Sequence, residues 1–330
     1  MTRILAYRFS AFGDVAMTAP VIKEFLIQNP ETEIIMVSRK NFEALFSNIP
    51  RLIFHGIDVE QYDGYFGLKK LAKELHLLYH PNLVADLHGV IRSRLLNKFL
   101  ERKSYKVFKI NKGKEEKQHL TDVWNLEKIQ LQPTVERYAD VFRAMGFSMV
   151  LSHQLENNLK QKKGVGFAPF AQHKGKMLPL DKSFVLAKKI AEKYPVYFFG
   201  GGKNEQDLLE QWEKEIPNTK SLAGKLKLDG ELEKIASLEI MISMDSANMH
   251  LASLVGTRCV SIWGATHPFA GFLGYGQKME DVIQVKDLTC RPCSVFGDKD
   301  CYRGDWACLN ELQVEKIYDK VSSIVDENLN

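Results

Sequence analysis

The chain has 330 residues, of which 45% are hydrophobic and 26% are charged, and this balance excludes a disordered, collagen-like or low-complexity protein. No apolar run reaches the roughly 20 residues of a membrane-spanning helix. The first residues become polar too soon for a signal peptide, so we expect a cytoplasmic protein, and the length favours two domains. The number of cysteines, five, is odd, which argues against a disulfide framework.

Apolar runs of strand length alternate with helical patterns in the first half of the chain. The predicted strands are 3–8, 33–38, 52–55, 83–88 and 105–110, and the predicted helices are 15–28, 40–48, 68–79, 91–100 and 134–145. Strand–helix alternation is typical of a parallel sheet with helices on both faces. We therefore expect an α/β domain over residues 1–155.

A polar stretch at 156–163 lacks periodicity and is the predicted linker. After it the alternation resumes, with strands at 165–168, 196–199, 240–244 and 259–263 and helices at 183–193, 205–215, 232–237 and 247–255. We expect a second α/β domain over 164–310 and a helix over 311–330 that packs on a domain. Two doubly wound domains in tandem predict a cleft that faces the carboxyl ends of both sheets, where ligands bind.

The first candidate site follows the first predicted strand, in the segment Arg8–Val15. Ser10 and Gly13 suit a tight loop, and Asp14 lies near the start of a helix. The loop is neither a dinucleotide-binding fingerprint nor a P-loop. Asp14 is therefore either a helix cap or a general base that faces a ligand.

Two further loops follow strands of the second half. In the segment 168–179, a glycine lies between Lys174 and Lys176, which either bind phosphates or form a basic surface. After the strand at 196–199, three glycines either let a ligand approach the backbone closely or form a flexible connector. The candidates in this second loop are Gly200, Gly201, Gly202, Lys203 and Glu205.

A buried strand ends just before Asp245, and a helix is predicted to begin at the next residues. Free N–H groups at such a helix start form an anion site, which the partial positive charge of the helix end reinforces. Asp245 either caps this helix or accepts a hydroxyl group of a ribose or sugar. His250 lies one turn later, at the same strand end, and is either structural or part of the site.

Positive charge is concentrated between Arg92 and Lys117, where 26 residues carry a net charge of +7. Such a run either faces phosphates or an anionic membrane surface, or is an ordinary solvated face. Aromatic residues are not interleaved with these charges as they are in stacking platforms, so we expect no nucleic-acid partner.

Four of the five cysteines lie within 19 residues, at Cys290, Cys293, Cys301 and Cys308. Four thiols can hold a structural zinc ion, although only the first pair has the tight C-x2-C spacing. Reduced thiols in an irregular loop, with a conditional disulfide, are the alternative. Cys259 lies in a predicted strand and is expected in the core.

Together these segments resemble glycosyltransferase family 9, the ADP-heptose:lipopolysaccharide heptosyltransferases. The segment 10–15 resembles the family's S-x-x-G-D loop, and 86–93 resembles its D-L-x-G strand end followed by a basic helix. The segment 176–179 resembles K-x-W-P, 245–252 resembles D-[ST]-G-x-x-H-x-A, and 263–268 resembles G-x-T-x-P. Ala247 replaces a usual glycine, and Met177 and Leu178 replace a usual basic–Trp pair.

The resemblance implies a GT-B fold, in which two Rossmann-like domains hold the active site between them. It implies an inverting transfer that requires no cofactor and no catalytic metal. The implied donor is an ADP-sugar that carries a heptose or a related sugar and binds to the C-terminal domain. The implied acceptor is lipopolysaccharide core or another phosphorylated glycolipid, bound by the N-terminal domain, with peripheral contact at the inner face of the cytoplasmic membrane.

By correspondence with the family motifs, Asp14 is the implied base for the acceptor hydroxyl, and Lys176 neutralises the donor diphosphate. The implied donor contacts are Gly200, Gly201, Gly202, Lys203, Glu205, Asp245, Ser246, Ala247, Asn248 and His250. The implied acceptor contacts are Ser10, Gly13, His88, Arg92 and Arg94. Two alternatives stay open: a nucleotide-sugar epimerase or hydrolase of the same fold, and a non-catalytic nucleotide-sugar-binding protein.

Overall fold

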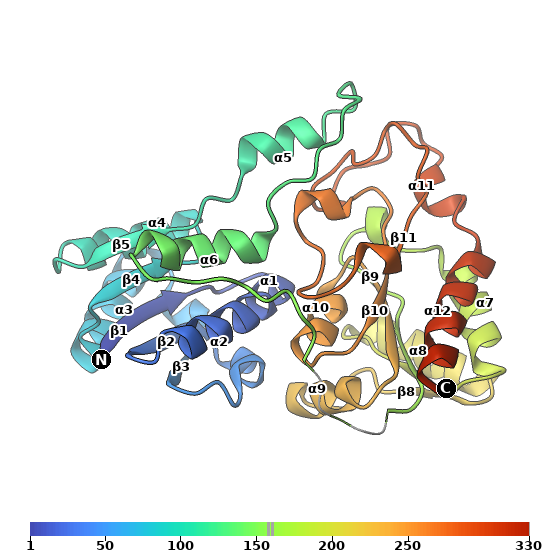
Figure 1. Cartoon of the computed structure of the whole chain (residues 1–330), viewed down its shortest axis with the longest axis horizontal. Helices are drawn as coiled ribbons and strands as arrows, with labels where there is room; N and C mark the ends of the chain where they lie inside the picture. Colours follow the sequence, from blue (N-terminus) through green and yellow to red (C-terminus); the bar gives the residue numbers. More distant parts are fainter. Residues whose placement is uncertain (157–158, 160–161, 330) are drawn as a thin grey trace. The chain divides into compact units, whose positions relative to one another are not determined.

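The computed structural model describes residues 1–156, 159 and 162–329. The chain divides into two compact units, coloured by sequence in Figure 1. Unit 1 comprises Met1–Gly113 and Thr134–Ser152, and unit 2 comprises Lys114–Pro133 and His153–Asn330. The segment 114–133, expected in the first domain, therefore belongs to unit 2. The predicted linker at 156–163 lies partly outside the described residues, which omit 157–158 and 160–161.

Unit 1 is built on a parallel sheet with the strand order β3-β2-β1-β4-β5. Its strands are β1 (Thr2–Tyr7), β2 (Thr32–Arg39), β3 (Leu52–Ile57), β4 (Leu83–Asp86) and β5 (Lys106–Lys109). The chain winds outward first on one side of β1 and then on the other. The pair β1 and β4 is therefore a topological switch point, where loops diverge and leave room for a ligand.

Helices cover both faces of this sheet. Successive side chains of β1 point to opposite faces, and both sets are buried. Leu5 and Tyr7 pack in one cluster with Leu71 of α3 and Leu96 of α4, whereas Phe25 of α2 stacks on Phe142 of α6. The helices are α1 (Phe12–Ala16), α2 (Thr18–Gln28), α3 (Gly64–Tyr79), α4 (Ile91–Glu101) and α6 (Thr134–Ala144), with 3-10 turns at Lys40–Phe46 and Val59–Tyr62. The predicted helix 15–28 is thus two helices, and 40–48 is a 3-10 helix.

Unit 2 contains a second parallel sheet, with the strand order β11-β10-β9-β6-β7-β8. Its strands are β6 (Val165–Ala168), β7 (Val196–Phe198), β8 (Thr219–Ser221), β9 (Ile240–Met244), β10 (Cys259–Ile262) and β11 (Val282–Ile283). The order changes direction between β6 and β9, which is the switch point of this sheet. The short edge strands β8 and β11 were not predicted from the sequence.

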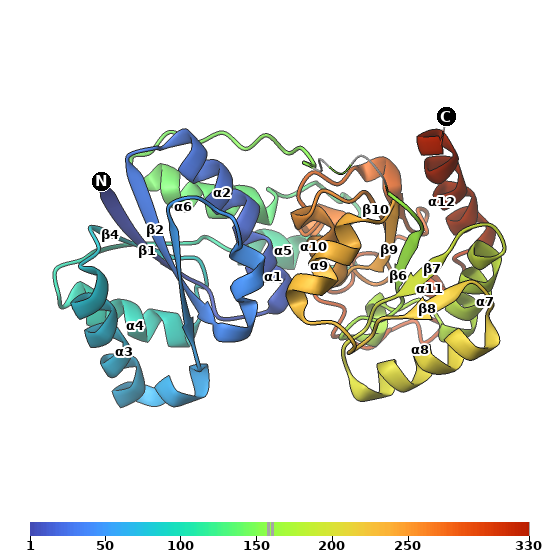
Figure 2. The same ribbon diagram turned by 90° about the horizontal axis from the view of Figure 1, so that it is seen from below.

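The helices of unit 2 are α5 (Lys114–Leu120), α7 (Leu180–Ala191), α8 (Lys203–Glu215), α9 (Leu228–Ala236), α10 (Ala247–Leu254), α11 (Ala307–Asn310) and α12 (Val314–Leu329), with 3-10 turns at Lys174–Lys176, Pro268–Ala270 and Met279–Asp281. Helices cover both faces of the sheet (Figure 2), whereas α5 lies apart from its strands (Figure 1). The C-terminal helix α12 packs beside α7, and its residues Ile317, Val321 and Ile324 join the core.

Within the described part of the chain, none of the helices combines the length and the apolar character that crossing a membrane requires.

Replacing Ile317 with alanine should destabilise unit 2 by about 2–5 kcal/mol, because this fully buried side chain docks α12 onto the sheet. All four tryptophans of the chain lie in unit 2, so urea unfolding followed by tryptophan fluorescence reports on this unit. The exposed neighbour Lys316 provides the control, since Lys316→Ala should leave the unfolding midpoint nearly unchanged. Equal effects of the two substitutions would contradict this docking.

Candidate active site

The residues singled out from the sequence lie at the carboxyl ends of the central strands of each sheet. In unit 1, Asp14 lies in α1, shortly after β1, and His88 lies in the turn that follows β4; these two strands are neighbours. In unit 2 the loops that follow β6 and β9 carry Lys176 and Asp245, and these strands are also neighbours. Each pair of loops therefore meets at a switch point, the usual ligand position in doubly wound folds.

In unit 1, a buried arginine holds Asp14. Arg8 directly follows β1, and its Nη2 lies 2.6 Å from Oδ2 of Asp14. The same guanidinium donates from Nη1 to the carbonyl of Leu87 at 2.7 Å and lies over the ring of Tyr138. The Arg8 side chain is 5% exposed, whereas that of Asp14 is 24% exposed. The Asp14 carboxylate is thus fixed in position and balanced in charge, and part of it remains open to a ligand.

The turn after β4 is organised by the carboxylate of Asp86, which is fully buried. Its Oδ1 accepts hydrogen bonds from the backbone N–H groups of His88 and Gly89, at 2.9 and 2.8 Å. Its Oδ2 accepts from the hydroxyl of Ser93 at 2.9 Å and from the side-chain amide of Asn97 at 2.8 Å. Asp86 therefore positions the turn, and it is too enclosed to act on a ligand itself.

His88 is held as a neutral imidazole beside Ser10. Burial lowers the pKa of His88 to about 3, and the nearby cations Arg8 and Lys112 act in the same direction. Its Nε2 lies 3.3 Å from the hydroxyl of Ser10. The structure thus brings together two of the residues that the sequence assigned to the acceptor.

The other expected acceptor residues are more dispersed. Gly13 lies in the first turn of α1, while Arg92 and Arg94 lie on α4. The guanidinium of Arg92 pairs with Oδ1 of Asp63 at 2.5 Å, and Arg94 is exposed. The basic run from 92 to 117 is also divided, because its last four residues belong to unit 2, where Lys117 is buried over an aromatic ring. The run is therefore not one continuous charged face of one domain.

In unit 2, a lysine, a carboxylate and a hydroxyl form a chain of contacts. Nζ of Lys176 lies 2.9 Å from Oδ2 of Asp245, which also accepts a hydrogen bond from the hydroxyl of Thr266 at 2.8 Å. Asp245 is 3% exposed, and the Lys176 side chain is 16% exposed. The buried carboxylate and hydroxyl fix the ammonium group, which keeps a part of its surface for a ligand.

The helix α10 begins beside this ion pair. Ser246 is its N-cap residue, and no side chain caps the helix, so Ser246, Ala247 and Asn248 stay together at a helix start with the geometry of an anion site. The hydroxyl of Ser246 instead lies 3.1 Å from that of Ser243. His250 is buried in the next turn of the helix.

The glycine loop after β7 is bonded to its own helix. Oε2 of Glu205 accepts a hydrogen bond from the N–H of Gly201 at 2.7 Å and a longer one from that of Gly202 at 3.4 Å. Lys203 is exposed and pairs with Asp207. A phosphate at Gly200–Gly202 would have to replace the Glu205 carboxylate, so a phosphate role for this loop remains a prediction.

Three residues of this region were not recognised as parts of the site from the sequence: Arg8, Thr266 and Gly297. Arg8 and Thr266 lie within the segments 8–15 and 263–268 discussed above. The sequence does not show that Arg8 contacts Asp14 and Leu87, or that Thr266 contacts Asp245. Gly297 has a left-handed φ of +73°, and a Cβ there would lie 2.7 Å from Cγ of Lys176. The loop around Gly297 therefore limits the position of the lysine.

The same loop is anchored by the buried guanidinium of Arg291. It donates to the carbonyls of Val285 at 2.7 Å and Thr266 at 2.8 Å, and also to that of Gly264. Burial lowers the pKa of Arg291 to about 10, which leaves it charged at neutral pH. One side chain thus joins the cysteine-rich loop to the segment that supplies Thr266.

The four clustered cysteines line one small cavity of unit 2 without forming a metal site. Cys290, Cys293, Cys301 and Cys308 all contribute to its wall, and all are free thiols. Among the described residues, no group of three or more His, Cys, Asp or Glu side chains is arranged to hold a metal ion. Cys308 instead packs in the hydrophobic core, where burial raises its pKa to about 12. The described geometry is that of reduced thiols, one of the two possibilities that the cysteine spacing left open.

Acid should destabilise unit 1 through His88. The folded protein keeps this imidazole neutral down to about pH 3, whereas the unfolded chain takes up the proton near pH 6.5. Stability should therefore fall by up to about 1.4 kcal/mol for each pH unit below 6.5. Urea unfolding followed by far-UV circular dichroism at pH 7 and pH 5 should show this loss reduced in His88→Gln and unchanged in the exposed control His119→Gln. An unchanged slope in His88→Gln would contradict the assignment.

Replacing Gly297 with alanine should displace Lys176 and weaken at least tenfold, in calorimetry, the binding of ADP, the nucleotide of the donor that the family resemblance implies. Gly304 offers a matched control, because it lies in the same loop with a φ of +77°, and an added Cβ there would meet no atom within 4 Å. Both substitutions carry the cost of a left-handed non-glycine residue, about 1–2 kcal/mol, but only Gly297→Ala meets the lysine. Equal ADP affinities in the two variants would refute the role of Gly297.

Known proteins share this architecture. A lipooligosaccharide heptosyltransferase 2 of Campylobacter jejuni is 24% identical over 319 residues, which cover 94% of this chain and 96% of that protein. The structure of a family 9 glycosyl transferase from Veillonella parvula aligns with a TM-score of 0.74 and 18% identity, over 99% of this chain and 98% of the other. That of the E. coli ADP-heptose lps heptosyltransferase II aligns over 100% of both chains, with a TM-score of 0.70 and 17% identity.

These structural likenesses confirm the expected fold class, two doubly wound α/β sheets of the GT-B type. The model of glycosyltransferase family 9 (heptosyltransferase) matches residues 69–300, well over half of the chain. That match includes the strand end at Asp86, the loop of Lys176 and the start of α10. The chain therefore belongs to glycosyltransferase family 9 and is a glycosyltransferase.

Proposed function

We propose that this enzyme transfers a heptose, or a related sugar, from an ADP-sugar to lipopolysaccharide core or a related surface glycan, with inversion and without a catalytic metal. The observation that carries the proposal is the fixed charge at the two switch points, Arg8 with Asp14 and Lys176 with Asp245. Relatives named lipooligosaccharide heptosyltransferase 2 and ADP-heptose lps heptosyltransferase II support the donor and the acceptor class.

The donor side of the proposal rests on the charge that develops when the sugar–phosphate bond breaks. The sugar ring becomes positive, as in other oxocarbenium-like displacements, and the departing diphosphate becomes more negative. Lys176 is already held in place by Asp245, so it can stabilise that charge without reorganising. The start of α10 follows Asp245 directly and adds its N–H groups and partial positive charge.

The acceptor side rests on Asp14. The attacking hydroxyl becomes acidic as its oxygen bonds to the sugar, so a carboxylate can take the proton late in the reaction. Arg8 orients this carboxylate and restricts its rotation, which an unpaired carboxylate at the surface would keep. The Ser10–His88 pair and the arginines of α4 would contact the acceptor's hydroxyl and phosphate groups.

We propose no metal for the transfer because Lys176 and the start of α10 supply the positive charge that a divalent cation provides at other diphosphate sites. No cofactor is proposed either, since the reaction moves a glycosyl group without a change of oxidation state. The basic residues of α4 support a peripheral contact with an anionic membrane at the cytoplasmic face, where a glycolipid acceptor would be presented.

Asp14→Asn should lower the turnover of ADP-heptose at least about 100-fold, because the amide cannot accept the proton, while ADP-heptose binding stays within about twofold. The measurement is ADP release in the presence of heptose-deficient lipopolysaccharide, with and without EDTA, and EDTA should have no effect. The isosteric control Glu43→Gln, at an exposed position of the 3-10 helix Lys40–Phe46 of unit 1, should behave as wild type.

Several outcomes would contradict this proposal. Turnover close to wild type in Asp14→Asn would reject the base, and loss of activity in EDTA would reject a metal-independent reaction. A preference for UDP- or GDP-sugars would reject the ADP donor. ADP release at the same rate without an acceptor would favour hydrolysis or epimerisation over transfer.

A further inference from the structure

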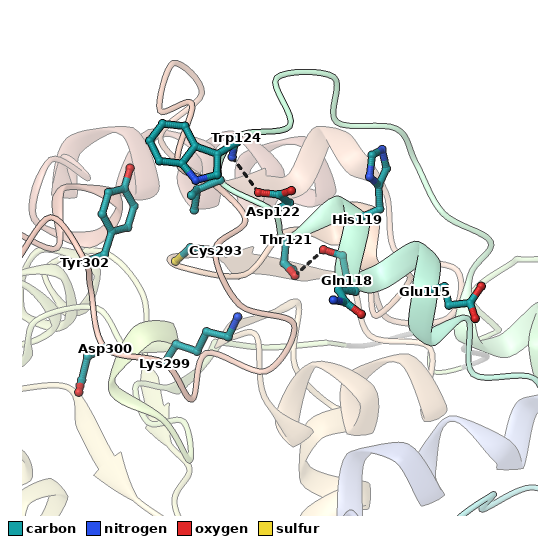
Figure 3. Close-up of a pocket in the computed structure, with 11 residues that line it drawn as sticks. Glu115, Gln118, His119, Thr121, Asp122, Trp124, Cys293, Lys299, Asp300 and Tyr302 are labelled. Atoms are coloured by element: carbon teal, nitrogen blue, oxygen red, sulfur yellow. Dashed lines mark hydrogen bonds between the residues drawn. The ribbon is translucent and has the colours of Figure 1, made fainter.

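A pocket that the proposed chemistry does not use lies in unit 2, between the segment 114–133 and the cysteine-rich loop 290–308 (Figure 3). Its volume is about 610 Å³, within the range of sites that bind small ligands. One wall comes from α5 and the residues after it, and the other from the loop that carries Lys299 and Tyr302.

The segment 114–133 is anchored firmly enough to form a lasting wall. The backbone N–H of Leu131 donates to the carbonyl of Phe269 at 2.9 Å, and the ammonium of Lys117 lies 4.2 Å from the ring centre of Phe272. Within the segment, Nζ of Lys128 donates to the carbonyls of Leu120 at 3.0 Å and Asp122 at 2.7 Å. These contacts close the segment on itself and on unit 2.

Two aromatic side chains stand at this pocket with their rings open to solvent. Trp124 is 87% exposed and Tyr302 is 67% exposed, although large aromatic rings are normally buried for their hydrophobic area. The backbone N–H of Trp124 donates to Oδ1 of Asp122 at 3.0 Å, so the tryptophan is positioned by the pocket's own wall. Exposed rings at a preformed pocket are characteristic of a surface that binds a partner.

The polar groups of the pocket fit hydroxyl groups better than phosphate. Its lining residues include three acidic ones, Glu115, Asp122 and Asp300, against the single lysine Lys299, and the carboxylate of Asp300 points away from Lys299 (Figure 3). Figure 3 shows the Lys299 side chain extending toward Gln118 of α5. Carboxylates accept hydrogen bonds from hydroxyls, and amide and ammonium groups donate to them, whereas an anion would be repelled by the carboxylates. Aromatic rings beside such groups match a sugar, which has an apolar C–H face and a rim of hydroxyls.

The pocket also shares its loop with the donor-side lysine. Gly297, whose missing side chain leaves room for Lys176, lies two residues before Lys299 and five before Tyr302. A ligand that contacts Lys299 and Tyr302 therefore touches the same loop that limits the position of Lys176. This continuity within unit 2 favours a ligand that takes part in the transfer reaction.

We propose that this pocket binds neutral sugar residues of the acceptor glycan, stacked on Trp124 and Tyr302, and so selects acceptors by their saccharide part. The inference rests on the proposed function, because it assigns the ligand to the acceptor of that reaction. It adds a saccharide subsite in unit 2 to the acceptor contacts proposed for unit 1.

The kinetic test compares Trp124→Ala and Tyr302→Ala with wild type in the transfer assay. Each should raise the KM for heptose-deficient lipopolysaccharide at least tenfold, while the KM for ADP-heptose and the kcat at saturating acceptor change less than about twofold. Trp124→Phe and Tyr302→Phe keep a stacking face and should recover most of the acceptor affinity. Val185→Ala, at an exposed position of α7, is the control for a change elsewhere on unit 2.

A binding test needs no turnover. Trp124 is the most exposed of the four tryptophans, since Trp212 and Trp263 are buried and Trp306 is partly buried, so acrylamide quenches mainly its fluorescence. The deacylated, dephosphorylated core oligosaccharide released from lipopolysaccharide should protect wild-type protein from quenching. The protection should disappear in Trp124→Phe, because this variant lacks the exposed tryptophan whose fluorescence is measured. ADP alone should give no protection.

The two tests separate failure of the pocket from failure of the proposed function. If wild type transfers heptose but neither alanine variant changes the acceptor KM, the pocket assignment is wrong and the transferase function stands. If wild type transfers nothing, the quenching test still decides the pocket: absence of protection by the oligosaccharide overturns it. Protection by ADP instead would mean that the pocket binds a nucleotide, which also overturns the proposal.

Discussion

The site depends on cations that the fold buries at the ends of its central strands. Arg8 directly follows β1, and its side chain is almost fully buried. Lys176 lies after β6, and only a small part of its side chain is exposed. A charge removed from water is costly unless an opposite charge is close. Asp14 and Asp245 meet that requirement, at 2.6 and 2.9 Å, so each carboxylate and its cation hold one another in a single geometry.

Such ion pairs contribute little to net stability, because the cost of desolvation offsets most of the attraction. Their position at the switch points therefore indicates function more than folding. Further side chains support them: Asp86 organises the turn beside the first pair through four hydrogen bonds, and Thr266 holds the second. The groups that we propose to face a ligand are thereby held in place by groups with no proposed ligand contact.

The loop 290–308 connects features that lie apart in the sequence. Arg291 ties it to the segment of Thr266, Gly297 limits Lys176, and Tyr302 lines the pocket beside the segment 114–133. The cysteines of this loop line a small cavity and are partly core. Their spacing left a zinc site and reduced thiols both open, and the folded loop keeps its shape through backbone and guanidinium contacts.

The sequence alone determined the strand–helix alternation, and with it two parallel sheets, because runs such as Ile4–Tyr7 and Ile240–Met244 are apolar on both faces of the strand. It also placed Asp14, Lys176 and Asp245 at strand ends, since these are local features of chain order. Only the tertiary structure decided which side chains pair. Asp245 lies 69 positions after Lys176 in the chain, yet the two form an ion pair. The hydrogen bond from the N–H of Gly201 to Glu205 depends on the rotamer of the Glu205 side chain. That the segment 114–133 belongs to unit 2 could not be predicted from the sequence either. Its contacts with that unit, such as the hydrogen bond from Leu131 to Phe269, join residues far apart in the chain, and hydrophobic periodicity does not show such contacts.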